Sequence, residues 1–418
     1  MRLTIVNSTA PGPASLLAPF FEALADCPGV ELAVLEQVPA WHRNGGSNRA
    51  AAASDAPRRY RLELLPAHFY NRRHASVQVL SGRFRRLLAK TDPDVIYILG
   101  EPGYLSTYQV VRFARRHLQN AKLCLLTAQN VYQRFPPPFP KIEQWVLSQI
   151  EHAFPIGRDH EDVLRRKGYR GPATHLPLGV DTRAFTPDRR PRPMTEIGLP
   201  RPVVGYVGDL LPARNVPLLI EALSLCPVPV GLLIVGDGPR RFELESVAMN
   251  KGLDGRVKFV GRVPHTQVPE YINCLDVLVL PSKAVRNRRF GVFQIANAEQ
   301  FGRVLVEAMA CGKPVVGSSC GEIPEVIGNA GRVFPEGDEK ALASVLEELC
   351  RDKTLRERLG QAGLARARAR YDWHIIAGQL LSVMRGMLAP AARPAQAGIQ
   401  PDIMAYGAAA KSVMVKQA

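Results

Sequence analysis

The stretch EQFGRVLVEAMACGKPVVGSS, residues Glu299–Ser319, holds the features that decide the fold of the second half of the chain. Its centre, Ala308–Ala310, consists of strong helix formers. Gly312 fits the position just past a helix end, and Pro314 follows where a helix can no longer continue. Val315–Gly317 is then a short apolar run that predicts a buried strand. The stretch therefore predicts a helix followed directly by a strand, as in layered α/β proteins.

Two carboxylates, Glu299 and Glu307, stand in this stretch with seven residues between them. We expect Glu299 in the loop before the helix, which begins near Gly302, and Glu307 about 8 Å further along the helix axis. A helix N-terminus attracts phosphate, because its free N–H groups and its dipole both favour negative charge. Carboxylates accept hydrogen bonds from sugar hydroxyls. The spacing therefore suits a nucleotide sugar, with phosphates at the helix end, Glu299 on the hexose and Glu307 on the ribose.

Further segments occur in an order that resembles one enzyme family. The E-x7-E pattern, followed by EAMACGKPVV and by GEIPEVI at Gly321–Ile327, resembles the retaining nucleotide-sugar glycosyltransferases of family 4 (group 1), which have the GT-B fold. Four more stretches are similar to segments of that family: PLGVDTRAFTP (177–187), VVGYVGDLLPARNVPLLIE (203–221), LIVGDGP (233–239) and VKFVGRVPHTQVPEYINCLDVLVLPS (257–282). The resemblance covers about half the chain. It implies two Rossmann-like α/β domains that face a central cleft.

Composition narrows the class of protein. The chain has 418 residues, enough for two domains or more, and its apolar fraction of 46% supports sizeable cores. Its seven cysteines form no CxxC pair and have no histidine partners at zinc spacing, which indicates a reduced protein without a metal scaffold. The N-terminal residues are too polar for a signal peptide, and no apolar run is long enough for a transmembrane helix.

The net charge of +16 is large, and part of it is concentrated in one segment. No nucleic-acid-binding motif accompanies it, so we expect no nucleic acid partner. The clustered cations are Arg58, Arg59, Arg61, Arg72, Arg73, Arg83, Arg85 and Arg86. Such a cluster fits either a solvated face or a surface that docks on anionic lipid headgroups, and both interpretations stay open.

Apolar strands alternate with helical segments along both halves of the chain. In the first half we expect strands at Leu3–Val6, Val30–Leu35, Asp94–Leu99 and Lys122–Thr127, and helices at Pro13–Ala25, Ala75–Lys90, Tyr104–Leu118 and Lys141–Glu151. This alternation predicts parallel α/β layers, which bind ligands beyond the carboxyl ends of their strands. We divide the chain into an acceptor-binding domain (1–180), a linker (181–202), a donor-binding domain (203–370), a crossing helix (371–388) and a disordered tail (389–418).

Glycosyl transfer breaks the bond between the anomeric carbon and phosphate, so negative charge grows on the leaving diphosphate. A metal ion can stabilise that charge, and so can cationic side chains beside a helix N-terminus. The resemblance implies the second, metal-independent solution, with no cofactor besides the nucleotide sugar. Asp92-Pro93-Asp94 matches a DxD metal motif, but it lies at the start of a buried strand, far from the donor segments, and fits a turn.

Arg214 stands where the resembling family has a lysine that contacts the pyrophosphate. Arginine suits phosphate through bidentate hydrogen bonds. With Glu299 it forms the pair that we expect to be catalytic. The full donor-binding set that the resemblance implies is Gly208, Asp209, Arg214, Val263, Glu299, Phe301, Gly302, Arg303 and Glu307. Taken alone, Arg303 could equally face solvent, and Val263 could equally belong to a core.

Asp209 is the main departure from the family pattern, which has an arginine at that position. An anion beside the diphosphate repels the leaving group and lowers transition-state stabilisation. The segment between Ser282 and Glu299 is longer than its counterpart in the family. As a hypothesis, it is a lid that restores positive charge over the donor. Its basic residues are Lys283, Arg286, Arg288 and Arg289.

The sequence gives fewer signals for acceptor-binding residues than for donor-binding residues. Glu101 follows the strand Asp94–Leu99, and Asn130 follows the strand Lys122–Thr127. Both lie at strand carboxyl ends, where ligands bind, so we take them as acceptor-side candidates. The alternative is that they are loop caps or turn formers. The loop Asn7–Pro13 has one glycine where family members have a glycine-rich loop.

Together these features predict a retaining hexosyltransferase that moves a hexose from a UDP- or GDP-sugar to a glycan or lipid-linked acceptor in bacterial envelope or exopolysaccharide synthesis. We expect a cytoplasmic enzyme, peripheral on the inner membrane, with an anionic membrane surface as a further partner. Two alternatives stay open. One is a nucleotide-sugar epimerase on the same scaffold, and the other is a non-catalytic nucleotide-sugar binder, which Asp209 favours.

Overall fold

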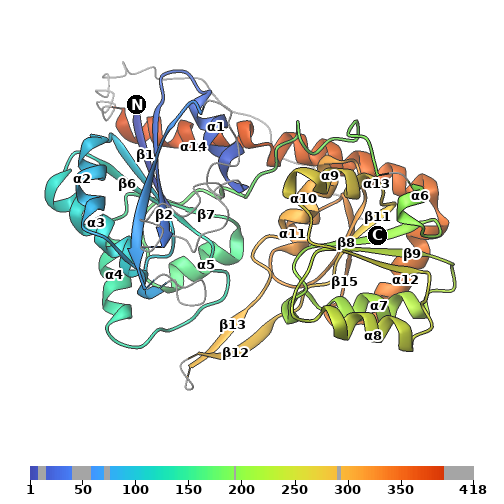
Figure 1. Ribbon diagram of the computed structural model, residues 1–418. Coiled ribbons are helices and arrows are strands. Elements are labelled where there is room, and N and C mark those ends of the chain that lie inside the picture. The colour runs from blue at the N-terminus through green and yellow to red at the C-terminus, as the bar shows by residue number, and fades with distance from the viewer. Residues whose placement is uncertain (8–15, 40–57, 70–75, 193, 290–292, 390–418) are drawn as a thin grey trace, which may run out of the picture.

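The computed structural model describes residues 1–7, 16–39, 58–69, 76–192, 194–289 and 293–389. The chain forms two α/β units, one built mainly by its first half and the other by its second half (Figure 1). Each unit has a mainly parallel sheet with helices packed against it. The predicted fold class of two Rossmann-like units is therefore confirmed.

The first unit contains one sheet, whose strands follow the order β4-β3-β2-β1-β5-β6-β7 among the described residues. Neighbouring strands run parallel, except that β4 pairs antiparallel with β3 at the edge. The strands are β1 (Arg2–Asn7), β2 (Glu31–Pro39), β3 (Arg61–His68), β4 (Val79–Leu80), β5 (Val95–Leu99), β6 (Lys122–Thr127) and β7 (His152–Pro155). The helices are α1 (Ala18–Ala25), α2 (Arg83–Lys90), α3 (Leu105–His117), α4 (Phe139–Gln149) and α5 (Arg158–Arg166).

The second unit contains a wholly parallel sheet in the order β10-β9-β8-β11-β14-β15, again among the described residues. The strands are β8 (Val203–Val207), β9 (Gly231–Val235), β10 (Val257–Gly261), β11 (Val277–Leu280), β14 (Val315–Ser318) and β15 (Gly331–Phe334). The helices are α6 (Met194–Ile197), α7 (Val216–Leu225), α8 (Arg241–Asn250), α9 (Val268–Asn273), α10 (Arg303–Ala310), α11 (Ile323–Ile327), α12 (Glu339–Arg351) and α13 (Lys353–Arg366). Short turns of helix lie at Pro212–Arg214, His265–Gln267 and Ala367–Tyr371.

The strand order of each sheet indicates where a ligand would bind in that unit. If the edge strand β4 is set aside, each sheet has the order third, second, first, fourth, fifth, sixth, which is that of Rossmann folds. In such sheets ligands bind beyond the carboxyl ends of the strands, at the point where the order reverses. That point lies between β1 and β5 in the first unit and between β8 and β11 in the second. The loops that leave these strands are therefore the first places to look for a site.

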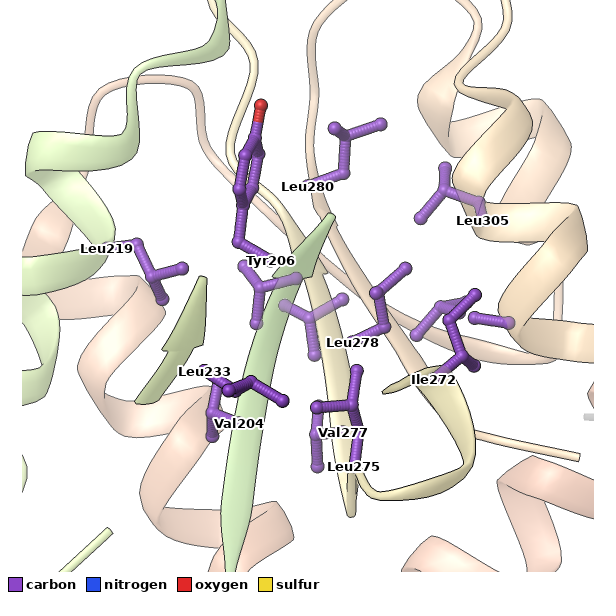
Figure 2. Packing of buried hydrophobic residues seen from close by; sticks show 14 of the residues in the cluster. Val204, Tyr206, Leu219, Leu233, Ile272, Leu275, Val277, Leu278, Leu280 and Leu305 are labelled. Atoms are coloured by element: carbon purple, nitrogen blue, oxygen red, sulfur yellow. The ribbon is translucent and has the colours of Figure 1, made fainter. Parts of the chain in front are cut away.

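Buried side chains hold strands β8 and β11 in place in the second unit. Leu219 of α7 and Leu305 of α10 lie on either side of the sheet, and Val204 of β8 and Leu278 of β11 fill the space between them (Figure 2). Each of these four side chains is fully buried. Burial of one such side chain contributes about 1.5–3 kcal/mol, so this layer fixes β8 and β11 firmly.

Two connections join the units, and they lie side by side. Val180 N donates to Tyr371 O at 2.8 Å, and Trp373 N donates to Val180 O at 3.3 Å. After this crossing, helix α14 (Trp373–Leu388) returns to the first unit and packs on α1 (Figure 1). The ring centroids of Trp373 and Phe20 are 4.9 Å apart. Helix α14 lies where the sequence predicts a crossing helix, and the predicted domain boundaries remain predictions.

The segment between β11 and α10 forms an antiparallel hairpin, β12 (Val285–Arg289) and β13 (Phe293–Asn297), which projects from the second unit (Figure 1). The sequence indicated only a basic segment that is longer than its family counterpart. The polar and charged residues of β12, VRNRR, give it no alternating apolar face, so the strand pattern is hidden there.

In the first unit one prediction was wrong and one strand was missed. Ala75–Lys90 is not one helix, because Val79–Leu80 form β4 and α2 begins only at Arg83. Strand β3 was not predicted, because Pro66 and the charged ends of RLELLPAH are untypical of strands. Pro66 is tolerated close to the sheet edge, where its carbonyl accepts from Ser81 N at 2.9 Å.

Some predictions fall outside the described residues. They concern residues 13–15 of the first predicted helix, most of the loop Asn7–Pro13, Arg72, Arg73 and the tail from residue 390. Within the described part of the chain, no helix combines the length and the apolar character needed to cross a membrane.

Candidate active site

Helix α10 carries the predicted site and has the predicted ends. Gly302 is its N-cap with φ +79°, and a Cβ there would come within 2.8 Å of the Leu280 side chain. At the other end Gly312 has φ +68°, its N donates to Met309 O at 2.9 Å, and Lys313 N donates to Ala308 O at 2.9 Å. These two bonds form a Schellman motif, which requires the left-handed residue that glycine supplies.

The Glu299 carboxylate lies in the loop before α10, where three segments meet. Arg214, which follows β8, forms an ion pair with Glu299 Oε2. Ser282, which follows β11, donates its hydroxyl to the same oxygen at 2.7 Å. The side chain of Glu299 is 9% exposed. The structure therefore brings together the two residues predicted to be catalytic, at the point where the strand order of the sheet reverses.

Glu307 lies inside α10 and is almost buried. His265 Nε2 is 3.0 Å from Glu307 Oε1, and Arg303 Nη2 is 3.9 Å from the same oxygen. The His265 ring also packs on Phe185, with 5.3 Å between the ring centroids. The carboxylate predicted to hold ribose is thus oriented by a histidine and an arginine.

Gly208 and Asp209 follow β8 at the same edge. Gly208 N donates to Val235 O at 2.9 Å, and a Cβ on Gly236 would meet the Gly208 carbonyl oxygen at 1.9 Å. Asp209 forms an ion pair with Arg262 at 3.0 Å, and both side chains are more than half exposed. The anion that departs from the family pattern therefore has a cation beside it.

The other predicted donor residues lie in different environments. Val263 is half-buried and packs against the core of the second unit. The Phe301 ring is buried edge-to-face against Tyr371, with 5.8 Å between centroids. Arg303 reaches the first unit, where Nη2 donates to Leu16 O at 3.4 Å. Its buried Nε has no hydrogen-bond partner among the described residues, so it remains free to donate.

The first unit contributes the loop after β6, residues 128–133, which we call the acceptor-side loop. Glu101 accepts from Thr127 Oγ1 at 2.6 Å and from Ala128 N at 2.8 Å, so it anchors the start of this loop. Asn130 Nδ2 donates to the carbonyl oxygen of Glu299 at 2.9 Å. Gln133 Nε2 donates to Ala296 O at 2.7 Å. Asn130 thus lies against the donor residues, whereas Glu101 acts through the loop.

A cavity of about 250 Å³ lies between this loop and the second unit. Arg214, Ser282 and Glu299 line it from the second unit, and Gln129, Asn130 and Gln133 line it from the first. The foot of the hairpin contributes Lys283, Ala296 and Asn297. The cavity therefore lies where the Glu299 and Arg214 pair of the second unit meets the acceptor-side loop of the first.

Metal ligands do not converge at this site. Within the described residues, no group of three or more His, Cys, Asp and Glu side chains could hold a metal ion. Asp92 and Asp94 both form ion pairs with Arg2, and Asp94 Oδ2 also accepts from Arg2 N at 2.7 Å. The DxD match is therefore part of the fold of the first sheet.

Sequence reasoning missed four residues that the structure places around the predicted set. They are Arg262, His265, Ser282 and Gln133. The first three follow strands β10 and β11, so the rule that ligands lie at strand carboxyl ends could have found them. Gln133 contacts the hairpin foot, and no sequence signal predicts that contact.

Comparison with known proteins shows what the chain is similar to. Residues 190–366 match the family model described as Glycosyl transferases group 1. A GDP-mannose-dependent alpha-(1-6)-phosphatidylinositol monomannoside mannosyltransferase of Mycolicibacterium smegmatis is 33% identical over 220 residues, 51% of this chain and 56% of that protein. A phosphatidyl-myo-inositol mannosyltransferase of Mycobacterium leprae is 37% identical over 177 residues, 41% of this chain and 43% of that protein. The chain spans about half the length of the curated relatives it matches.

Solved structures resemble nearly the whole chain. Sucrose-phosphate synthase from Thermosynechococcus elongatus matches with a TM-score of 0.68 at 21% identity, over 93% of this chain and 99% of that chain. Anabaena HepE in complex with UDP matches with a TM-score of 0.69 at 18% identity, over 92% of this chain and 100% of that chain. At such identities the likeness shows the fold alone. The chain therefore has the two-domain GT-B fold, and its residues 190–366 are similar to the group 1 glycosyl transferases.

Proposed function

We propose that this protein is a retaining glycosyltransferase that moves a hexose from a UDP- or GDP-sugar to a glycan or lipid-linked acceptor, in bacterial envelope or exopolysaccharide synthesis. The observation that carries the proposal is the meeting of Glu299, Arg214 and the N-terminus of α10 at the edge of the cavity between the units. A carboxylate for sugar hydroxyls and a cation for phosphate then lie side by side.

The ion pair between Arg214 and Glu299 is the resting form of this site. When the donor binds, hexose hydroxyls take the place of Arg214 on the carboxylate, and the diphosphate takes the place of Glu299 on the guanidinium. Arg214 then has the diphosphate as its counter-ion, and the Glu299 carboxylate keeps hydrogen-bond donors, so neither charged group is left without a partner. Glu307, oriented by His265, receives the ribose hydroxyls at the other end of the donor.

Transfer without a metal ion is part of the proposal. Arg214 and the free N–H groups at the start of α10 stabilise the charge that grows on the leaving diphosphate. Such groups, fixed in place before the reaction, are worth roughly a hundredfold to a thousandfold each in rate. Retention comes from transfer on the face of the sugar that the phosphate leaves, which needs no protein nucleophile.

The names of similar proteins indicate which nucleotide sugars should be tested first as donors. Mannosyltransferases named as GDP-mannose-dependent match about half of the chain, and the structural neighbour HepE has been solved in complex with UDP. GDP-mannose is therefore the first donor to test and UDP-glucose the second.

The test is a donor panel on the full chain, followed by transfer assays. A nucleotide sugar that binds the folded protein raises its melting temperature, by an amount set by concentration over Kd. We expect one sugar nucleotide to stabilise wild type and the control Glu348→Ala, whose carboxylate pairs with Arg332 away from the cleft, but not Glu307→Ala. No stabilisation of a well-folded wild type by any donor would refute the proposal.

A second candidate function, a non-catalytic nucleotide-sugar binder, follows from Asp209. Donor binding with no transfer to any acceptor would favour it. Conversion of the donor when no acceptor is present would instead favour an epimerase.

Docking on an anionic membrane surface is a further part of the proposal. Arg83, Arg85 and Arg86 are exposed on α2, and Arg112 and Arg116 are exposed on α3, whereas Arg59 and Arg61 form ion pairs with Asp26 and Glu63. Each exposed cation near such a surface is worth about 1 kcal/mol. Sedimentation with vesicles that contain anionic phospholipid tests this. Equal binding to neutral vesicles would refute it.

A further inference from the structure

Glu322 belongs to the second unit but caps a helix of the first. It precedes α11 and is 5% exposed, yet its carboxylate makes no capping bond to α11. Instead Glu322 Oε1 accepts from Asp159 N at 2.9 Å and lies 3.2 Å from His160 Nδ1. Asp159 and His160 form the first turn of α5, and His160 is fully buried. The contact is therefore a buried, charged bridge between the two units.

The first unit leaves space for this bridge. The N-cap of α5 is Gly157, which has no side chain with which to cap its own helix. A Cβ on Gly157 would lie 2.5 Å from each of the three atoms of the Glu322 carboxyl group. Its φ of −166° is ordinary extended backbone, so glycine is needed here for space and not for conformation. Gly157 of the first unit thus leaves the space that the Glu322 carboxyl group of the second unit fills.

The charge of Glu322 suits this position. A carboxylate is favoured at a helix N-terminus, where N–H groups are free and the dipole is positive. Burial acts to raise the pKa of Glu322, but the bonds from His160 and from Asp159 N outweigh it and hold the pKa below its ordinary value. The carboxylate is therefore ionised at neutral pH, and the bridge is charge-assisted.

The same residue is bonded to the donor site. Glu322 N donates to the carbonyl oxygen of Glu299 at 3.2 Å. That oxygen also accepts from Asn130 Nδ2 of the acceptor-side loop at 2.9 Å. A Cβ on Gly321 would meet it at 2.1 Å, so the approach again needs a glycine. The peptide group of Glu299 is thus held by a residue of each unit, and Glu322 connects it to α5.

We propose that Glu322 is a positioning residue that sets the first unit, with its acceptor-side loop, in register over the donor site. This inference rests on the proposed function. The donor contacts Arg214, Glu299 and Glu307, all in the second unit, whereas transfer needs both units aligned. A misplacement of about 1 Å between reacting groups can cost a hundredfold in rate. Loss of the bridge therefore affects transfer and leaves donor binding unchanged.

The experiment compares Glu322→Ala, Glu322→Gln and Gly157→Ala with the control Glu348→Ala. Donor affinity is measured by calorimetric titration with GDP-mannose and UDP-glucose, and transfer by steady-state kinetics with the acceptor. Amide hydrogen exchange of residues 157–163 and small-angle X-ray scattering detect loss of the bridge, and neither measurement requires catalytic turnover.

We expect Glu322→Ala to keep donor Kd within twofold of wild type, to lower kcat at least tenfold and to speed exchange at Asp159 and His160. Gly157→Ala, which displaces the carboxylate, should reproduce these effects. Glu322→Gln keeps an acceptor oxygen and should be intermediate. Wild-type kcat in both alanine variants would overturn the inference, and so would a loss of donor affinity that parallels the loss of kcat.

If wild type transfers no sugar from any donor, the proposed function fails. Hydrogen exchange and X-ray scattering then still test whether Glu322 bridges the two units. Faster exchange and a wider distribution of shapes in Glu322→Ala would support the bridge. Unchanged exchange and scattering would refute it.

Discussion

The pair of Asp209 and Arg262 decides how the departure from the family pattern affects donor binding. Arg262 neutralises Asp209 in the structure. We expect Arg262→Ala to weaken donor binding about tenfold, or roughly 1.4 kcal/mol, because Asp209 then faces the diphosphate unpaired. Adding Asp209→Asn should restore most of the affinity. Calorimetric titration of the two single variants and the double variant measures this coupling.

Additive losses in that cycle would contradict the interpretation, since they would mean that the two side chains act independently. A gain in turnover for Asp209→Arg alone would show that Arg262 compensates only in part.

Glu36 of β2 predicts a pH dependence of stability. It is buried, and Asn7 Nδ2 donates to its two oxygens at 3.1 and 3.2 Å. Burial raises the pKa of Glu36 from 4.5 to about 7, although the bond from Asn7 lowers it. The folded state therefore holds a proton that the unfolded state loses above pH 4.5. The free energy of unfolding should fall by about 3 kcal/mol between pH 4.5 and pH 7 through this group alone.

Urea unfolding across that range measures the effect. Glu36→Gln, which cannot ionise, should be more stable than wild type at pH 8 and about equal at pH 4.5. A difference between the two proteins that does not change with pH would contradict the assignment.

Single residues differ in how far the sequence predicts them. Glu299, Arg214 and Glu307 could be named because they stand at fixed distances from helix and strand ends. The residues that contact these three side chains could not be named from the sequence. His265 and Glu307 are far apart in the chain, and their contact depends on α9, which directly follows the turn of His265, packing beside α10. Spacing along the chain carries no information on such pairs.

Among the elements, the hairpin β12–β13 has the clearest testable role. Its foot lines the cavity, and Gln133 of the acceptor-side loop donates to Ala296 in it. Replacing residues 285–297 by a short Gly-Ser linker should raise the acceptor KM at least tenfold, because the wall facing that loop is lost. Donor Kd should stay within twofold of wild type. Gln133→Ala, a milder change, should raise the acceptor KM by a few-fold only.

The hypothesis of a charged lid predicts the opposite pattern. If the hairpin supplies positive charge to the diphosphate, changing Lys283, Arg286, Arg288 and Arg289 to Ala weakens donor binding and leaves the acceptor KM unchanged. Steady-state kinetics with both substrates varied separates the two roles.

Elements were predicted well where both faces of a strand are buried and poorly where they are not. The strands β5 and β6 are apolar runs bounded by turn residues, and their predicted bounds are confirmed within one residue. Strands β3 and β4 lie at the sheet edge, where burial is partial and charged or proline residues are allowed. The amphipathic helix signal of α2 was therefore extended wrongly across β4.

For the whole molecule, the docking of α14 on the first unit predicts where stability is lost. Trp373 is buried beside Phe20, and a Cβ on Gly179 would lie 2.5 Å from its ring. Trp373→Ala should lower the free energy of unfolding by about 3–5 kcal/mol. The matched control is Phe242→Ala on α8, which is 82% exposed and should change it by about 0.5 kcal/mol at most. Equal effects of the two changes in urea unfolding would contradict this packing.

The place of α14 in the chain has a consequence for biosynthesis. The buried side chains of this helix, from Trp373 to Met384, complete the core that α1 and β1 begin at the other end of the sequence. On the ribosome, every strand and helix of the second unit emerges before that core can close. The second unit can therefore fold first, and Phe20 lacks the contact with Trp373 until α14 has been translated. A chain that stops short of α14 leaves this apolar surface exposed, so it should be bound by chaperones and degraded by proteases more readily than a chain that includes α14.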